Sequence, residues 1–312
     1  MIVPLAVIAA LLLSAKPAHS FLPELATPSV RIKWPSLPVV WNLNPNISGA
    51  NISGSRSVAD VMQSSFAVWT SAPNIALSVV RGADSNVTSE SSSLPGVNLI
   101  CFICTDTSFS DVGTLAVTLF RFNVSTGAMT KTDILFNPNP SGVTFTTDPS
   151  SANGSIIDLQ TVATHEIGHF LGLDHSAVTN AVMFPFSPDI RETLAADDVA
   201  GMSLLYPKSP PDVAAGAIAG TVQFATGGGV FGAHVFADSV TGLGGFGMGV
   251  RNGPIGTLTD ANGNYAITGL PVDTYMVSAE PLDQPVTNTD VSDYAKVFGK
   301  TSVQTNFTTR QH

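Results

Sequence analysis

Three histidines and one glutamate gather in the stretch "THEIGHFLGLDHS", residues 164–176, in a chain of 312 residues that has six histidines in all. His165 and His169 are four positions apart, so on a helix both imidazoles lie on one face, within reach of one metal ion. Gly172 tolerates the left-handed conformation that ends a helix and reverses the chain. The reversed chain then returns His175 as a third nitrogen ligand. Three neutral histidines with an open fourth position are typical of catalytic zinc.

Glu166 follows the first of these histidines and can point at a metal-bound water. Zinc lowers the pKa of such a water to about 7, and Glu166 would take the proton as general base and deliver it to a leaving amine. The short pattern H-E-x-x-H can arise by chance on an amphipathic helix. A chance run of surface histidines, however, does not explain a glycine and a third histidine at these offsets. The full pattern therefore predicts a hydrolytic metal site with Glu166 as its catalytic residue.

The helices and strands that would position these groups follow from the apolar periodicity. Apolar residues along one face predict a helix within 57–72, and Ser57 with Asp60 resembles the capping pattern that begins one. Further helices are predicted at about 158–171 and 194–206. Strand-like runs separated by polar loops precede them, near residue 40 and at 75–80, 97–102, 114–122 and 132–137. Strands early and helices late predict an α+β fold.

Composition limits the function further. The net charge of −10 disfavours binding to nucleic acid or to an anionic membrane surface. Residues 2–13 are almost entirely apolar and lead into small residues that resemble a cleavage site, which predicts a signal peptide over residues 1–20. An uncleaved anchor is the alternative. No later run of about 18 apolar residues is present, so we expect no membrane contact after cleavage.

The two cysteines, Cys101 and Cys104, form a single C-x-x-C pattern. No second C-x-x-C is present to complete a zinc knuckle. With export predicted, a local disulfide or two quiet thiols are favoured over a redox-active pair.

A change in composition divides the chain after residue 208. Residues 209–215 belong to a proline-rich stretch and are predicted to be a linker. Residues 216–282 are rich in glycine, with short alternating runs separated by turn signals, which predicts a small antiparallel β-sandwich. Residues 283–312 are polar and are predicted only as a tail or part of an incomplete further segment.

The metal motif resembles the zinc motif of the metzincin metalloendopeptidases. With Asp174 and Ser176 around the third histidine, it is most similar to the matrixins. Met183 in "AVMFP" resembles their methionine turn, which lies beneath the metal and supports the site. The resemblance covers residues 30–208 and implies a metzincin-type domain, a twisted mixed sheet with helices.

Two further segments carry the matrixin resemblance. The stretch "LAADDVAGMSLLYP" (194–207) resembles the closing helix of the matrixin catalytic domain. Asp197 and Asp198 match its paired aspartates, one of which usually braces the methionine turn. The stretch "TDILFN" (132–137) resembles the strand that borders the substrate cleft.

For function, the resemblance implies a zinc endopeptidase that hydrolyses peptide bonds through a zinc-bound water activated by Glu166. With the predicted signal peptide, we expect a secreted monomer that acts on extracellular proteins. An extended polypeptide substrate is expected to add a strand beside 132–137. Pro185 and Phe186 are expected to wall the pocket for the residue after the scissile bond. One catalytic zinc is expected. A Ca²⁺ site built from backbone carbonyls and loop aspartates such as Asp106, Asp111 or Asp133 stays open, since scattered loop aspartates are usually just solvated. No cysteine-bearing "PRCGxPD"-like segment is found, so thiol-based latency is not expected.

Residues 216–282 resemble the carboxypeptidase regulatory-like, transthyretin-like β-sandwich through "GAIAGTV" and "TDANGNYAITGLP". This implies a role in stability, spacing or binding, so a chain ending near Lys208 is expected to keep peptide cleavage. Two other functions stay open: an inactive metzincin-like extracellular binding or adhesion protein, and a zinc amidase acting on a non-protein amide. The intact Glu166 argues against the binding protein, which has no need of a base.

Overall fold

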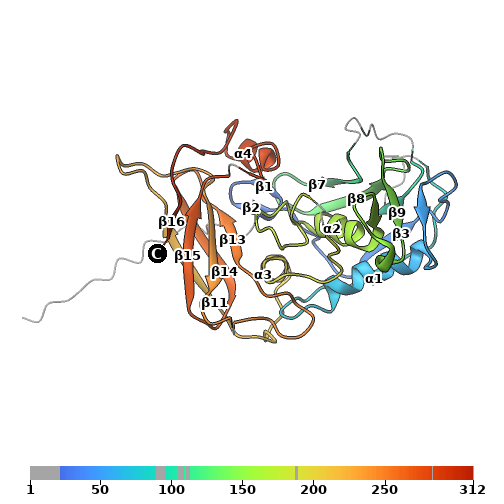
Figure 1. Cartoon of the computed structure of the whole chain (residues 1–312), viewed down its shortest axis with the longest axis horizontal. Helices are drawn as coiled ribbons and strands as arrows, with labels where there is room; N and C mark the ends of the chain where they lie inside the picture. The colour runs from blue at the N-terminus through green and yellow to red at the C-terminus, as the bar shows by residue number, and fades with distance from the viewer. Residues whose placement is uncertain are drawn as a thin grey trace, which may run out of the picture.

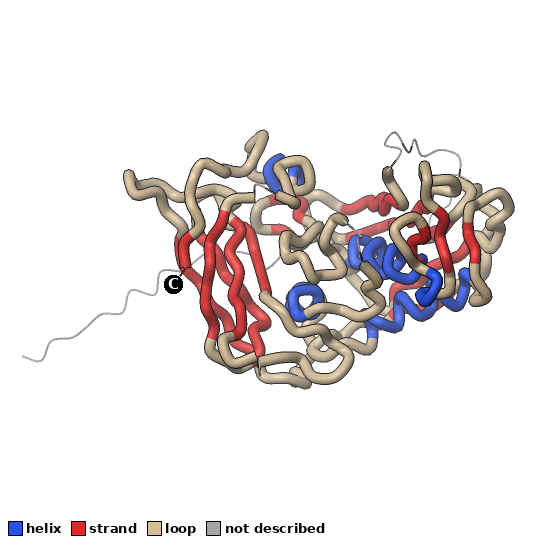
Figure 2. Tube along the Cα trace, viewed as in Figure 1, coloured by secondary structure: helices blue, strands red, loops and turns tan. Residues whose placement is uncertain are grey.

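The computed structural model describes residues 22–88, 96–104, 109, 113–186, 189–242, 244–282 and 284–311. Two regions lie side by side (Figure 1). Residues 22–207 combine helices with strands, and residues 215–311 contain strands, long loops and a short helix (Figure 2). The predicted signal peptide, residues 1–20, lies outside the described residues. No helix in the described part of the chain combines the length and the apolar character needed to cross a bilayer.

A five-stranded mixed sheet forms the centre of the first region, in the order β5-β3-β6-β8-β7. Its strands are β3 (Val39–Leu43), β5 (Val79–Arg81), β6 (Leu99–Cys101), β7 (Ala116–Phe122) and β8 (Met129–Phe136). β3, β5, β6 and β8 run parallel, whereas β7 pairs antiparallel with β8. The mixture of sheet and helix agrees with the predicted class. The expectation that residues 132–137 border the cleft as an edge strand is wrong, because β8 is paired on both sides and β7 takes the edge.

Helices α1 (Val58–Thr70) and α2 (Leu159–Leu171) both begin at a side-chain cap. Ser57 Oγ accepts a hydrogen bond from Asp60 N at 3.1 Å, which is the start that the sequence predicts. Asp158 Oδ2 accepts from Thr161 N at 2.7 Å at the start of α2. Such caps satisfy backbone N–H groups that the first helical turn leaves unpaired. α2 packs against α1, β7 and β8.

Aromatic side chains join these helices to the sheet. Trp41 of β3 stacks on Phe66 of α1 with ring centroids 4.8 Å apart, and Phe66 meets Phe170 of α2 edge to face at 5.5 Å. All three side chains are fully buried. Removing one such ring from a core costs about 3–5 kcal/mol. The core therefore holds α2, which carries the metal motif, firmly against the sheet.

Short elements complete the first region. β1 (Leu25–Thr27) pairs with β2 (Val30–Arg31), and a small parallel sheet follows the order β10-β9-β4. Its members are β4 (Ile52–Ser53), β9 (Thr144–Thr146) and β10 (Ile156–Asp158), with a 3₁₀ turn at Pro149–Ser151.

Helix α3 (Ala196–Leu205) joins the first region to the second. The second region has two antiparallel sheets, β11-β14 and β13-β12-β15-β16. α3 packs against β13 and β14, and one apolar core runs from Val199 and Met202 of α3 to Ile255 and Leu270. The likeness to a regulatory-like sandwich stays a prediction. The strands are β11 (Ala215–Thr221), β12 (His234–Ser239), β13 (Ile255–Leu258), β14 (Asn264–Pro271), β15 (Tyr275–Glu280) and β16 (Arg310–Gln311).

The proline-rich segment between the regions is held by Asn74. The side chain of Asn74 donates to Val213 O and accepts from Val213 N, both at 2.8 Å. The backbone N–H of Asn74 donates to Asp212 Oδ2 at 3.0 Å, and its carbonyl accepts from Lys208 N at 2.9 Å. These hydrogen bonds fix residues 208–213 against the first region. The separate unit that the composition predicts stays a prediction.

The polar residues after 283 belong to the second region. They form α4 (Ser292–Val297) and β16, which pairs with β15. Tyr294 of α4 stacks on Phe231 with ring centroids 5.8 Å apart, and its hydroxyl donates to Thr259 O at 3.1 Å. α4 also lies beside β1 of the first region (Figure 1).

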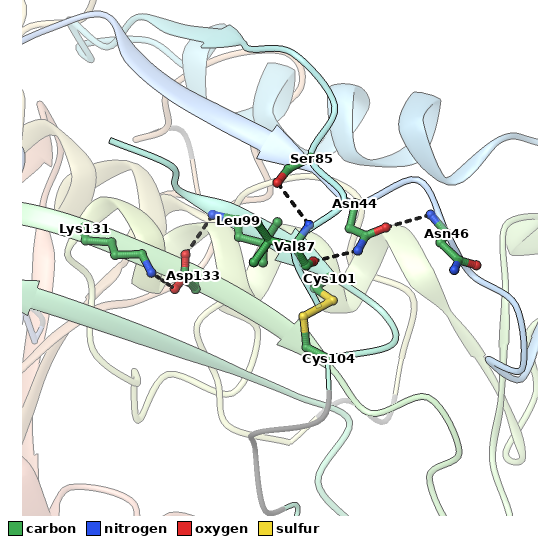
Figure 3. Close-up of a disulfide and its surroundings, with 9 residues drawn as sticks. All are labelled: Asn44, Asn46, Ser85, Val87, Leu99, Cys101, Cys104, Lys131 and Asp133. Atoms are coloured by element: carbon green, nitrogen blue, oxygen red, sulfur yellow. Dashed lines mark hydrogen bonds and ion pairs between the residues drawn. A yellow bond between two sulfur atoms is a disulfide. The ribbon is translucent and has the colours of Figure 1, made fainter. Parts of the chain in front are cut away.

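Cys101 at the end of β6 forms a disulfide with Cys104 (Figure 3), which decides between the bonded and the free forms. Nearby, the buried carboxylate of Asp133 accepts from Leu99 N at 2.8 Å and pairs with Lys131 Nζ at 2.7 Å (Figure 3). Protein groups therefore engage both oxygens of this carboxylate.

Candidate metal centre

Helix α2 presents two of the three motif histidines on one face. The Nε2 atoms of His165 and His169 lie 3.1 Å from each other. Gly172 ends the helix with φ at 108°, and an added Cβ would overlap the carbonyl oxygen of Ile32, so both conformation and space require glycine. The chain then turns and brings back His175. One ligand atom from each histidine lies within 4.8 Å of the other two.

The second ring nitrogen of each histidine faces a backbone carbonyl. A carbonyl oxygen only accepts hydrogen bonds, so Nδ1 carries the proton and donates it, and Nε2 keeps its lone pair. Hydrogen bonds of this kind fix the orientation of metal-binding imidazoles. Three such rings fit one Zn²⁺ ion and the pattern H-E-x-x-H-x-x-G-x-x-H. The partners of His165, His169 and His175 are, in turn, Val182 O at 2.8 Å, Leu173 O at 2.7 Å and Asp290 O at 3.3 Å.

Burial keeps the two helical histidines neutral. Desolvation, and to a smaller extent the neighbouring His175, lowers the pKa of His165 to about 3. The pKa of His169 is also lowered, first by burial and then by the other two histidines. Because a metal binds the neutral imidazole, both rings are in the form that a cation needs.

Glu166 stands apart from the ligand cluster. Its side chain is buried, and desolvation raises its pKa to about 7, although a hydrogen bond from Thr118 opposes this shift. Thr118 Oγ1 donates to Glu166 Oε2 at 2.6 Å. Thr118 comes from the edge strand β7, so the sheet itself positions the carboxylate. A carboxylate with a pKa near neutrality is suited to act as a general base.

The residues around Met183 form a turn beneath α2. Met183 is buried, and a Cβ added at Gly168 would overlap its sulfur, so the thioether packs directly against the helix between the two ligands. Asp198 of α3 accepts from Val182 N at 2.8 Å and from Met183 N at 3.1 Å. Because Val182 O in turn accepts from His165, Asp198 braces both the turn and one ligand.

Asp197 connects the site to the second region. Its Oδ2 accepts from Ser176 Oγ at 2.6 Å, and its Oδ1 accepts from Gly256 N of β13 at 2.8 Å. Burial, and then the neighbouring Asp198, raises the pKa of Asp197 to about 7. The residue after the third histidine is thus tied to a strand that lies far along the chain.

The three histidines and Glu166 line a cleft of about 770 Å³. Residues 113–118 and Phe120, on or beside β7, line it as well. Pro185 and Phe186 border the same cleft, where Phe186 is 44% exposed. The subsite that these two residues would form stays a prediction. Residues from the second region, within 289–293, complete the lining.

Within the described ranges, the three histidines are the only group of His, Cys, Asp and Glu side chains placed to share an ion. Asp133, proposed for calcium from the sequence, is instead engaged by Leu99 and Lys131. Asp106 and Asp111 lie outside the described residues. Asp133 therefore gives no support for a calcium site.

Three residues that contribute to the site were not identified from the sequence: Gly168, Thr118 and Asp290. Gly168 carries a signal, because a glycine inside a helix costs about 1 kcal/mol relative to alanine and so calls for a packing reason. Thr118 is an ordinary strand residue without a local signal. Asp290 lies 115 positions from His175, too far for any motif to connect them.

Part of this chain is similar to known proteins. The family profile described as Matrixin matches residues 112–207. Karilysin of Tannerella forsythia is 52% identical over 56 residues, which cover 18% of this chain and 12% of karilysin. Metalloendoproteinase 5-MMP of Arabidopsis thaliana is 48% identical over 58 residues, 18% of this chain and 16% of the relative. Matrix metalloproteinase-25 of Homo sapiens is 44% identical over 66 residues, which cover 19% of this chain and 12% of that protein.

These alignments span less than a fifth of each relative's own length. The residues that the Matrixin profile matches include the three histidines, the buried glutamate and the methionine turn. Residues 112–207 of this chain are therefore a matrixin domain, with the mixed helix and sheet architecture that the family implies.

Proposed function

We propose that the protein is a zinc-dependent endopeptidase that cleaves extended polypeptides. The observation that carries the proposal is one cleft in which three histidines converge beside a buried glutamate that is not a ligand. When bound by His165, His169 and His175, zinc supplies a Lewis acid and lowers the pKa of a bound water to about 7. A similar relative bears the name Metalloendoproteinase 5-MMP, which is the same class of activity.

Residues of the chain handle the proton and the substrate. Glu166 accepts a proton from the attacking water and delivers it to the leaving amine. Thr118 holds Glu166 Oε2 by its 2.6 Å hydrogen bond, so the carboxylate does not have to reorient during the reaction. Pro185 and Phe186 would border the side chain that follows the scissile bond.

The edge strand β7 replaces residues 132–137 as the docking strand in this proposal. An edge strand has backbone N–H and C=O groups free to pair with another chain. An extended peptide can use them by adding a strand to the sheet. β7 also supplies Thr118 to the catalytic glutamate, so a peptide paired with β7 lies close to the reacting groups.

We extend the proposal to export and domain organisation. Residues 2–13 have the apolar character of a signal peptide. The Cys101–Cys104 disulfide belongs to the kind of bond that persists in an oxidising compartment. A monomeric peptidase unit would cover residues 30–208, followed by a regulatory-like sandwich over 216–282, and extracellular proteins would be the substrates.

Hydrolysis of casein by the full chain, with and without a zinc chelator, tests the activity. We expect cleavage that the chelator stops and added zinc restores. Glu166→Ala should keep about one zinc per chain but lose activity on the order of a hundredfold or more. His169→Ala should lose the zinc. His234→Gln is the matched control, since His234 lies in β12, outside the cluster, and the change should spare both properties.

The outcomes of these assays distinguish the peptidase from the amidase and from the binding protein. A folded, zinc-loaded protein that leaves casein intact would refute the peptidase. Hydrolysis of a small non-protein amide by that protein would then support the amidase, and no hydrolysis would support the binding protein. Near-wild-type cleavage by Glu166→Ala would show that another group is the base.

A further inference from the structure

One ligand of the metal centre is oriented by a part of the chain that lies outside the matrixin match. His165 and His169 donate to carbonyls within residues 112–207, whereas His175 Nδ1 donates to Asp290 O at 3.3 Å. We propose that residues 286–297, named here the C-terminal strap, are a working part of the metal centre. Asp290 is then a positioning residue for His175. The inference rests on the proposed zinc site.

The Asp290 carbonyl is held in place by a turn that the Asp290 side chain closes. Asp290 Oδ2 accepts from Thr287 N at 2.8 Å and from Thr287 Oγ1 at 2.9 Å. Asp290 N donates to Thr287 O at 3.1 Å. Asn288 Oδ1 in the same turn accepts from Val303 N at 2.6 Å. With these four hydrogen bonds, the turn has little freedom to direct its carbonyl away from His175.

Apolar packing anchors the strap on both regions. Val291 and Tyr294 belong to the same buried cluster as Leu22 and Phe184, and Phe184 comes directly after Met183 of the methionine turn. Phe231 of the second region, in the same cluster, stacks on Tyr294. The strap therefore shares a buried apolar cluster with Phe184, the residue next to the methionine turn.

The strap also forms part of the cleft wall. Thr289, Asp290, Ser292 and Asp293 line the same cleft as the three histidines. A chain ending near Lys208 would lack this wall and the carbonyl that orients the third ligand. We therefore expect such a chain to bind zinc more weakly, in contrast to the expectation from the sequence that it keeps peptide cleavage.

The zinc affinity should fall when the hydrogen bond between His175 and Asp290 O is weakened. Losing the partner of a metal-binding histidine typically lowers metal affinity by about 10–100-fold, because the ring is no longer held in its binding orientation. The carbonyl of Asp290 survives a side-chain substitution, so only its placement is loosened. We therefore expect the zinc affinity to fall by about tenfold, which is the lower end of this range.

The experiment measures the zinc dissociation constant of the full chain by competition with a chromophoric chelator. Asp290→Ala should bind zinc about tenfold more weakly, and the absorption spectrum of its cobalt-substituted form should change. Asp290→Asn keeps an oxygen that can accept from Thr287 and should restore most of the affinity. Asp238→Ala is the matched control, because Asp238 is an exposed aspartate in β12 of the same region. Urea unfolding of each apo protein checks the fold.

Wild-type affinity in folded Asp290→Ala, or equal losses in Asp290→Ala and Asp238→Ala, would overturn the inference. So would an Asp290→Asn protein as weak as Asp290→Ala. Should Asp290→Ala fail to fold, Thr287→Ala decides, since it removes one of the hydrogen bonds and should still weaken zinc binding measurably. If the wild-type protein binds no zinc, both the proposed metal centre and the role of the strap are refuted. If it binds zinc but does not cleave casein, only the proposed peptidase activity is refuted.

Discussion

Gly168→Ala should lower the stability of the protein, although alanine is the better helix former. Gly168 lies in α2, directly before the second metal ligand. A Cβ added there would approach Met183 Sδ to under 3.0 Å and would lie 3.1 Å from Trp69 Cζ2. Ordinary contact between such atoms begins near about 3.5 Å, so the sulfur has to retreat by more than about 0.5 Å.

Both neighbours are enclosed, so neither has open space to retreat into. Met183 is 2% exposed; its N–H donates to Asp198, and its carbonyl accepts from Ser176 N at 2.8 Å. Trp69 is fully buried and its Nε1 donates to Thr164 O at 2.9 Å. Forcing a methyl into a packed core costs about 1–3 kcal/mol, and the helix preference for alanine offsets about 1 kcal/mol of that. Because the overlap is severe, we expect a net loss of about 1–2 kcal/mol in the free energy of unfolding.

Urea unfolding of the metal-free protein, followed by tryptophan fluorescence, measures this loss. Gly216→Ala is the matched control, because a Cβ at Gly216 in β11 meets nothing within 4 Å. It should stay within about 0.5 kcal/mol of the wild type. A free energy of unfolding that is unchanged or raised in Gly168→Ala would refute the reasoning that Met183 is rigidly packed under the helix.

Three other outcomes are expected from the same measurement. Asp198→Ala leaves three buried backbone N–H groups without their acceptor and should cost about 3 kcal/mol or more; a loss below about 1 kcal/mol would contradict the bracing role. The pKa of Asp197 is raised from 3.8 to about 7 by burial, so between these pH values the folded protein binds more protons than the unfolded chain. Its stability should therefore fall as the pH rises through that window, by up to about 1.4 kcal/mol per pH unit, and equal slopes in wild type and Asp197→Asn would argue against this. Reducing the Cys101–Cys104 disulfide, which closes a short loop, should cost about 2 kcal/mol or less and leave zinc affinity unchanged; a lower zinc affinity would show that the disulfide supports the site.

The sequence by itself determines the features that depend on neighbours along the chain. The three histidines meet because helical spacing places two of them on one face and Gly172 turns the chain to return the third. The start of α1 at Ser57 likewise depends on a hydrogen bond to a residue three positions away. Local geometry of this kind leaves a local pattern, since the interacting groups are separated by a fixed number of residues.

Only the tertiary structure decides which distant segments meet. The residues of a strand do not by themselves determine which strands it pairs with. Residues 132–137 are therefore expected from the sequence at the edge of the sheet, whereas the structure places β7 there. Proline-rich composition predicts a boundary near Lys208, but the hydrogen bonds of Asn74 and the core through α3 join the two regions. The carbonyl of Asp290 reaches His175 across 115 positions. Every residue carries a backbone carbonyl, so no residue type marks the one that will orient a metal ligand.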